Sequence, residues 1–93
     1  MRANINVRWE TLKDQGRGSV SDLSATGCFI LSGGAVHSGE LVQMHLYFED
    51  EIVALWGQIA YAVSEIGFAV RFMFAKDDGD RLRRLLDVLS VAG

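Results

Sequence analysis

Proline is absent from this chain of 93 residues, cysteine occurs once, and no apolar run is long enough to span a membrane. One cysteine cannot form an intramolecular disulfide, which fits a reducing compartment, and Cys28 is expected to pack in the core. No signal peptide is evident. We therefore expect a cytoplasmic protein with no membrane insertion. No low-complexity segment or repeat divides the chain, so residues 1–93 are predicted to form a single small domain.

The charge of the chain is mildly negative and unevenly distributed. Nine basic and twelve acidic residues give a formal net charge of −3, which does not indicate a general binder of polyanions. Before Val20 the basic residues Arg2, Arg8, Lys13 and Arg17 outnumber the acidic Glu10 and Asp14. The segment 40–52 contains Glu40, Glu49, Asp50 and Glu51 and no lysine or arginine. A small anion would be drawn to the N-terminal side. A barrel that binds single-stranded nucleic acid would need aromatic residues on an exposed basic strand face. We expect no nucleic-acid partner, and we expect Trp9 and Trp56 to pack in the core or on the barrel.

Apolar residues alternate with polar ones along most of the chain, which is typical of half-buried strands. Strands are predicted over 5–12, 17–22, 28–31, 41–48, 52–63 and 66–74, separated by glycine or charged residues. In the first of them, Ile5, Val7, Trp9 and Thr11 share one face. Short strands at this spacing predict an all-β fold, a six-stranded antiparallel barrel.

The period of the pattern changes near the C-terminus. Leu82, Leu85, Leu86 and Leu89 follow the spacing of one face of a helix, predicted over about 78–91. Asp77 is a candidate N-cap, and Asp78 and Asp80 suit the positive end of the helix dipole. Arg81, Arg83 and Arg84 would form its solvated face. The barrel is therefore expected to end in a C-terminal helix that packs on it.

The segment 22–27 places Asp22, Ser24 and Gly27 at D-x-S-x-x-G spacing between two predicted strands. The carboxylate can accept two hydrogen bonds from guanine N1 and N2, and a hydroxyl two residues later can bond a phosphate oxygen. The glycine allows a turn or a close approach to a ligand. The same three residues are also typical of a structural turn, in which Asp and Ser bond nearby backbone.

D-x-S-x-x-G is half of the signature of the PilZ family, bacterial domains that bind cyclic di-GMP, and this segment resembles it. The segment 67–72 resembles the family's late strand. The other half, R-x-x-x-R, is incomplete. Arg2 aligns with its second arginine, and the first would lie three residues before Met1. The resemblance implies a barrel with a C-terminal helix, and ligand contacts from Arg2, Asp22, Ser24 and Gly27, with Arg8 a further candidate.

Two functions follow from the resemblance. The first is a receptor domain that binds cyclic di-GMP and relays the signal to a protein partner or a neighbouring domain, as the N-terminal segment closes over the ligand. The alternative is a degenerate adaptor that binds no nucleotide and acts through protein contacts. His37 and His45 lie within no pattern that completes a metal site, and no catalytic arrangement is evident. We expect no enzyme activity, no metal and no cofactor.

Overall fold

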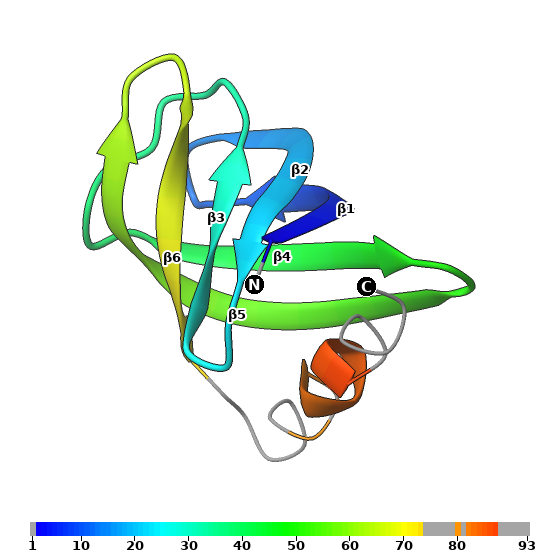
Figure 1. Cartoon of the computed structure of the whole chain (residues 1–93). Helices are drawn as coiled ribbons and strands as arrows, with labels where there is room; N and C mark the ends of the chain where they lie inside the picture. The colour runs from blue at the N-terminus through cyan, green and yellow to red at the C-terminus, as the bar shows by residue number, and fades with distance from the viewer. Residues whose placement is uncertain (1, 74–79, 81, 88–93) are drawn as a thin grey trace.

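Six strands lie in the part of the chain that the computed structural model describes, residues 2–73, 80 and 82–87 (Figure 1). They are β1 (Arg2–Glu10), β2 (Gln15–Leu23), β3 (Gly27–Leu31), β4 (Leu41–Phe48), β5 (Glu51–Val63) and β6 (Gly67–Met73). All neighbouring pairs are antiparallel, and the strands close a barrel in the order β1-β2-β3-β6-β5-β4. The predicted six-stranded antiparallel barrel is confirmed.

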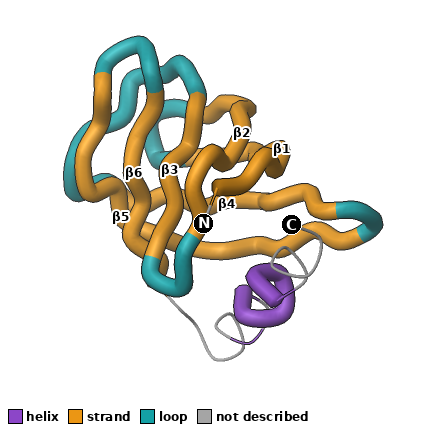
Figure 2. The backbone as a smooth tube through the Cα atoms, viewed as in Figure 1, coloured by secondary structure: helices purple, strands orange, loops and turns teal. Residues whose placement is uncertain are grey.

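Closure of the barrel depends on strands that are distant in sequence. The last strand, β6, pairs with β3, and β1 pairs with β4. The longest strand, β5, pairs with β4 along its first half and with β6 along its second. The hairpin of β4 and β5 extends beyond the rest of the barrel, and the C-terminal helix lies beside it (Figures 1 and 2).

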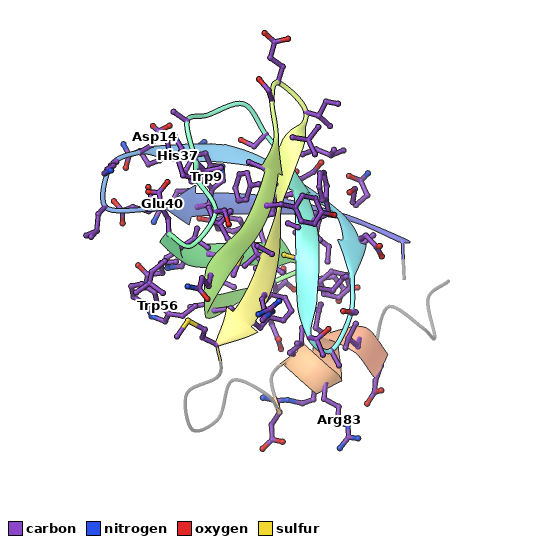
Figure 3. The ribbon with its side chains drawn as sticks, turned by 90° about the vertical axis from the view of Figure 1, so that its left-hand side faces the viewer. Trp9, Asp14, His37, Glu40, Trp56 and Arg83 are labelled. Atoms are coloured by element: carbon purple, nitrogen blue, oxygen red, sulfur yellow. The ribbon has the colours of Figure 1, made fainter. Side chains whose placement is uncertain are left out.

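The core is built from the inward side chains of the alternating strands. Trp9 is fully buried, and its ring meets that of Phe68 edge-on with centroids 5.2 Å apart. The alternation of Ile5, Val7, Trp9 and Thr11 is confirmed, since all four are buried. Trp56 differs, because its side chain is 48% exposed on the outside of the barrel, whereas Trp9 points inward (Figure 3). The prediction that Trp56 packs on the barrel face holds, and the alternative that it lies in the core is wrong.

In the described part of the chain, the C-terminal helix comprises residues 80 and 82–87. Leu82 and Leu85 are buried in the same core cluster as the strands, and Leu86 is partly buried against it. Full burial of a leucine contributes about 1.5–3 kcal/mol, so the predicted apolar face fastens the helix to the barrel. Arg83 and Arg84 are exposed, as predicted. The proposed cap Asp77, its neighbour Asp78, and Arg81 and Leu89 lie outside the described residues.

The first strand ends earlier than the alternation predicts, because Thr11 begins a turn. Its backbone N–H donates to the carbonyl of Asp14 at 2.8 Å, and its buried hydroxyl accepts from the N–H of Asp14 at 3.1 Å. The carboxylate of Asp14 accepts from the N–H groups of Ala35 and Gln15, and these bonds lower the pKa of Asp14. The loop before β4 is thereby tied to the β1–β2 turn (Figure 3).

Within the described residues, no helix has the length and apolar character needed to cross a bilayer.

Candidate functional site

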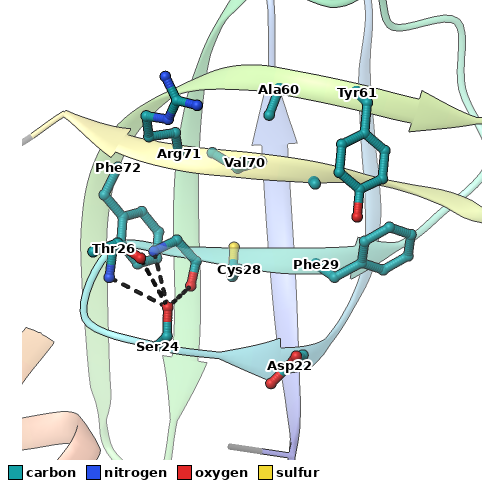
Figure 4. A pocket seen from close by; sticks show the side chains of 12 residues that line it. Asp22, Ser24, Thr26, Cys28, Phe29, Ala60, Tyr61, Val70, Arg71 and Phe72 are labelled. Atoms are coloured by element: carbon teal, nitrogen blue, oxygen red, sulfur yellow. Dashed lines mark hydrogen bonds between the residues drawn. The ribbon is translucent and has the colours of Figure 1, made fainter.

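The turn between β2 and β3 is held by the hydroxyl of Ser24. This oxygen accepts from the N–H groups of Thr26 and Gly27, both at 3.3 Å, and donates to the carbonyl of Gly27 at 3.2 Å. The backbone N–H of Ser24 donates to the same carbonyl at 2.9 Å. Figure 4 shows the bonds of the hydroxyl converging on this one side chain. The hydroxyl therefore has a structural function that needs no ligand, as the turn interpretation predicted.

Gly27 is required where β3 approaches β6. A Cβ atom at this position would overlap the carbonyl oxygen of Val70, because the two backbones lie in direct contact there. The N–H of Phe72 also donates to the carbonyl of Thr26 at 2.9 Å. The glycine thus serves the close approach of two strands, and the turn is fastened to β6 as well as to β3.

A β-bulge turns Asp22 away from the core. Val20 is fully buried, and in a regular strand the residue two positions later would also point inward. The pairing of β2 with β3 shifts between Val20 and Asp22, and Asp22 is exposed. A second β-bulge turns Tyr61 outward, since the pairing of β5 with β6 shifts between the buried Ile59 and Tyr61. Bulges often redirect a side chain near a binding site.

The two redirected side chains line one pocket of about 600 Å³ on the outside of the barrel (Figure 4). β2 supplies Asp22; the turn supplies Ser24 and Thr26; β3 supplies Gly27, Cys28 and Phe29; β5 supplies Ala60 and Tyr61; β6 supplies Ala69, Val70, Arg71 and Phe72. The rings of Phe29 and Tyr61 lie 6.3 Å apart at one end. Arg71 is paired with Gly27 on one side and Gln58 on the other, and Figure 4 shows its side chain extending from β6 toward β5.

The pocket combines opposite charges with an inert thiol. Burial raises the pKa of Cys28 to about 12, and the negative charge of Asp22 adds to this effect. The thiol therefore stays protonated at neutral pH and is a poor nucleophile. Within the described residues, no group of three or more His, Cys, Asp or Glu side chains is placed to hold a metal ion. The arrangement suits binding of a ligand with hydrogen-bond donors, an anionic group and a flat ring.

The structure brings three of the five predicted site residues into this pocket. Asp22, Ser24 and Gly27 line it. The backbone of Arg2 pairs with Asp22, so β1 begins beside the turn, and the side chain of Arg2 lies outside the described part of the structure. Arg8 is further along β1, opposite Arg17 on one side and His45 on the other, and it does not line the pocket.

Arg71, Tyr61 and Phe29 are pocket residues that the sequence analysis did not identify. The sequence does indicate that Arg71 points outward, because it is the polar residue between the inward Val70 and Phe72. Nothing in the local pattern indicates that its strand pairs with β3. Tyr61 falls two positions after an inward residue, so alternation alone assigns it to the core.

Comparison with known proteins identifies related folds. A family model described as the PilZ domain matches residues 1–88. The PilZ domain of CeSA from a cellulose-synthesising bacterium has a TM-score of 0.81 at 18% identity, and the match covers 97% of this chain and 96% of that one. The Bacillus subtilis inhibitor of motility, MotI/DgrA, has a TM-score of 0.71 at 18% identity, covering 94% of this chain and 49% of that one. The chain thus spans about half the length of MotI/DgrA. At such identities the two structures show the fold alone. No curated protein matches the chain.

Proposed function

The chain belongs to the PilZ domain family, and we propose that it is a receptor domain that binds cyclic di-GMP in the pocket beside the 22–27 turn. PilZ domains are in general receptors for this second messenger. The observation that carries the proposal is the pocket itself, which combines Asp22 and Ser24 of the motif with Arg71 and Tyr61 from other strands. We also propose that the domain acts by binding, with no enzymatic step.

The side chains around the pocket match the chemistry of a guanine nucleotide. The carboxylate of Asp22 can accept from guanine N1 and N2 together. The guanidinium of Arg71 can form a bidentate, charge-assisted contact with a phosphate or with the Hoogsteen edge of guanine. The exposed ring of Tyr61 offers a surface for stacking a base. Each group recognises a different part of the same ligand.

We expect the N-terminal segment at the start of β1 to respond to ligand binding. Because the backbone of Arg2 pairs with Asp22, a ligand at the turn would lie next to the N-terminal segment. Contacts from Arg2 to the ligand would favour the closed arrangement of that segment and change the surface offered to a partner protein or neighbouring domain. Arg8 does not line this pocket, and its contribution of positive charge to the ligand stays a prediction.

A second candidate function is the adaptor that binds no nucleotide. It is favoured by the bonds within the turn, because Ser24 and Gly27 have structural reasons to be present even without a ligand. A domain that no longer binds nucleotide could keep both residues to preserve its turn. Ligand titration separates the two functions.

The experiment is calorimetric titration with cyclic di-GMP at fixed salt. The wild-type chain should bind, and Asp22→Ala should weaken binding by about 1–3 kcal/mol, because guanine donors are left unpaired. The matched control is Arg83→Ala, which removes an exposed charge on the helix and should leave affinity unchanged. A chain carrying an additional arginine three residues before Met1 should bind more tightly. If neither the wild-type nor the extended chain binds at high micromolar ligand, the receptor proposal fails and the adaptor takes its place.

A further inference from the structure

A second surface of the barrel carries three basic side chains in one row across three strands. Arg8 of β1 is directly opposite Arg17 of β2 and, on its other side, opposite His45 of β4. Arg8 and Arg17 are exposed, and neither guanidinium forms an ion pair with another described residue. Like charges directly opposite each other in a sheet are destabilising. Glu10 shares the face but stands two residues further along β1.

Exposed apolar side chains lie beside this row. Tyr47 of β4 is paired with Ile52 of β5, and they are 40% and 60% exposed. Trp56 lies further along β5 with 48% of its surface exposed (Figure 3). We call the outward surface formed by Arg8, Arg17, His45, Tyr47, Ile52 and Trp56 the arginine face. Two shallow hollows, of about 410 and 430 Å³, flank the arginine pair.

We propose that the arginine face is a docking surface for a protein segment that combines acidic and apolar side chains. Arginine, tyrosine and tryptophan are enriched in protein interfaces and supply many of their strongest contacts. Carboxylates of such a partner would lie over Arg8 and Arg17 and relieve their mutual repulsion. Its apolar side chains would cover Tyr47, Ile52 and Trp56. Because Arg8, Arg17 and His45 do not line the nucleotide pocket, the proposal stands whether or not the domain binds cyclic di-GMP.

The observations favour a protein over a nucleic acid, although the face does place aromatic residues beside basic ones. The same hairpin that carries Tyr47 and Ile52 ends in Glu49, Asp50 and Glu51. These carboxylates, Glu10 and the net charge of −3 would repel an extended phosphate backbone. Ile52 is aliphatic and offers no ring for a base to stack on. A short acidic segment can meet the two arginines and avoid the hairpin tip.

The test uses the whole chain and a synthetic helical peptide with leucine on one face and glutamate along its edges. Binding is followed by amide chemical shifts and by tryptophan fluorescence, in which the exposed Trp56 should respond and the buried Trp9 should not. The wild type should bind it, with shifts in β1, β2 and β4. The double variant Arg8→Glu with Arg17→Glu should weaken binding at least about tenfold. Its control, Arg83→Glu with Arg84→Glu, changes the net charge equally on the C-terminal helix and should bind within about twofold of the wild type. Neither arginine belongs to the arginine face, and Arg84 lines a separate hollow with Glu49, Asp50 and Glu51.

Several results would overturn the proposal. Equal weakening by both double variants would show attraction by net charge alone. A peptide with lysine in place of glutamate should not bind, and comparable binding would contradict the role of the arginines. Tighter binding of oligothymidylate than of the glutamate peptide would assign the face to nucleic acid. Self-association of the wild type that the Arg8/Arg17 variant abolishes would assign it to a second copy of the chain.

Discussion

The 22–27 turn and the arginine face both carry polar groups on the barrel surface, but the fold uses them in different ways. At the turn, the hydroxyl of Ser24 bonds the local backbone, and Gly27 admits the carbonyl of Val70. On the arginine face, Arg8 and Arg17 oppose each other without an ion pair to another described residue. The fold explains the first set without a ligand. The second set is expected to destabilise the fold, because like charges lie opposite each other, and a docked partner is the explanation we propose for it.

The largest effect is expected from Gly27→Ala. The new Cβ would overlap a backbone oxygen of β6, and relieving this contact must move one of the two strands. We expect a loss of about 3 kcal/mol in the free energy of unfolding, at the upper end for overpacking. Denaturant unfolding measures it. Gly33→Ala is the control, since nothing lies within 4 Å of a Cβ there. A loss no larger than that of the control would mean that Gly27 is not structural.

Arg71→Ala is expected to weaken ligand binding without affecting the fold. Arg71 is exposed and lines the pocket, so its removal should leave the unfolding free energy nearly unchanged. We expect affinity for cyclic di-GMP to fall by about 1.5–3 kcal/mol, the usual contribution of a hydrogen bond to a charged group. Calorimetric titration beside Arg83→Ala tests this. Unchanged affinity with wild-type stability would exclude Arg71 from the ligand site.

These residues show how far sequence alone predicts the molecule. Alternation identified the strands because each strand has one buried face, and the apolar spacing of Leu82 and Leu85 identified the helix. The Asp22 motif was found because its spacing is local. Arg71 was missed because it reaches the pocket through the pairing of β3 with β6, which joins segments about 40 residues apart and leaves no local pattern.

A β-bulge explains why the sequence pattern did not identify Tyr61 as a pocket residue. Alternation places Tyr61 inward, since it follows the buried Ile59 by two positions, and the shift in β5–β6 pairing turns it outward. The extra residue of a bulge changes the face of every residue after it. The pairing of Arg8 with Arg17 is different, because it follows from the short turn at 11–14 and was open to prediction from the sequence.

Ser24→Ala tests whether the motif hydroxyl serves the fold, the ligand or both. Removing it leaves the N–H groups of Thr26 and Gly27 without this acceptor. We expect a loss of about 0.5–1.5 kcal/mol in the free energy of unfolding, the net contribution of a typical hydrogen bond. Ser24→Thr keeps the hydroxyl and is the control. Loss of affinity for cyclic di-GMP at unchanged stability would mean that the hydroxyl is a ligand contact and not a turn bond.

The smallest effect, and the one that distinguishes the two regions most directly, is expected from Arg8→Glu. This change places a carboxylate opposite Arg17 and replaces repulsion with attraction, so the isolated chain should gain about 0.2–1 kcal/mol in the free energy of unfolding. The gain should shrink at high salt, because both side chains are exposed. Arg83→Glu controls for the change in net charge. Substitutions at the turn are expected to destabilise the chain, whereas this one should stabilise it and weaken binding of the acidic peptide. Destabilisation by Arg8→Glu, beyond that of the control, would show that Arg8 supports the fold and would remove the reason to look for a partner on this face.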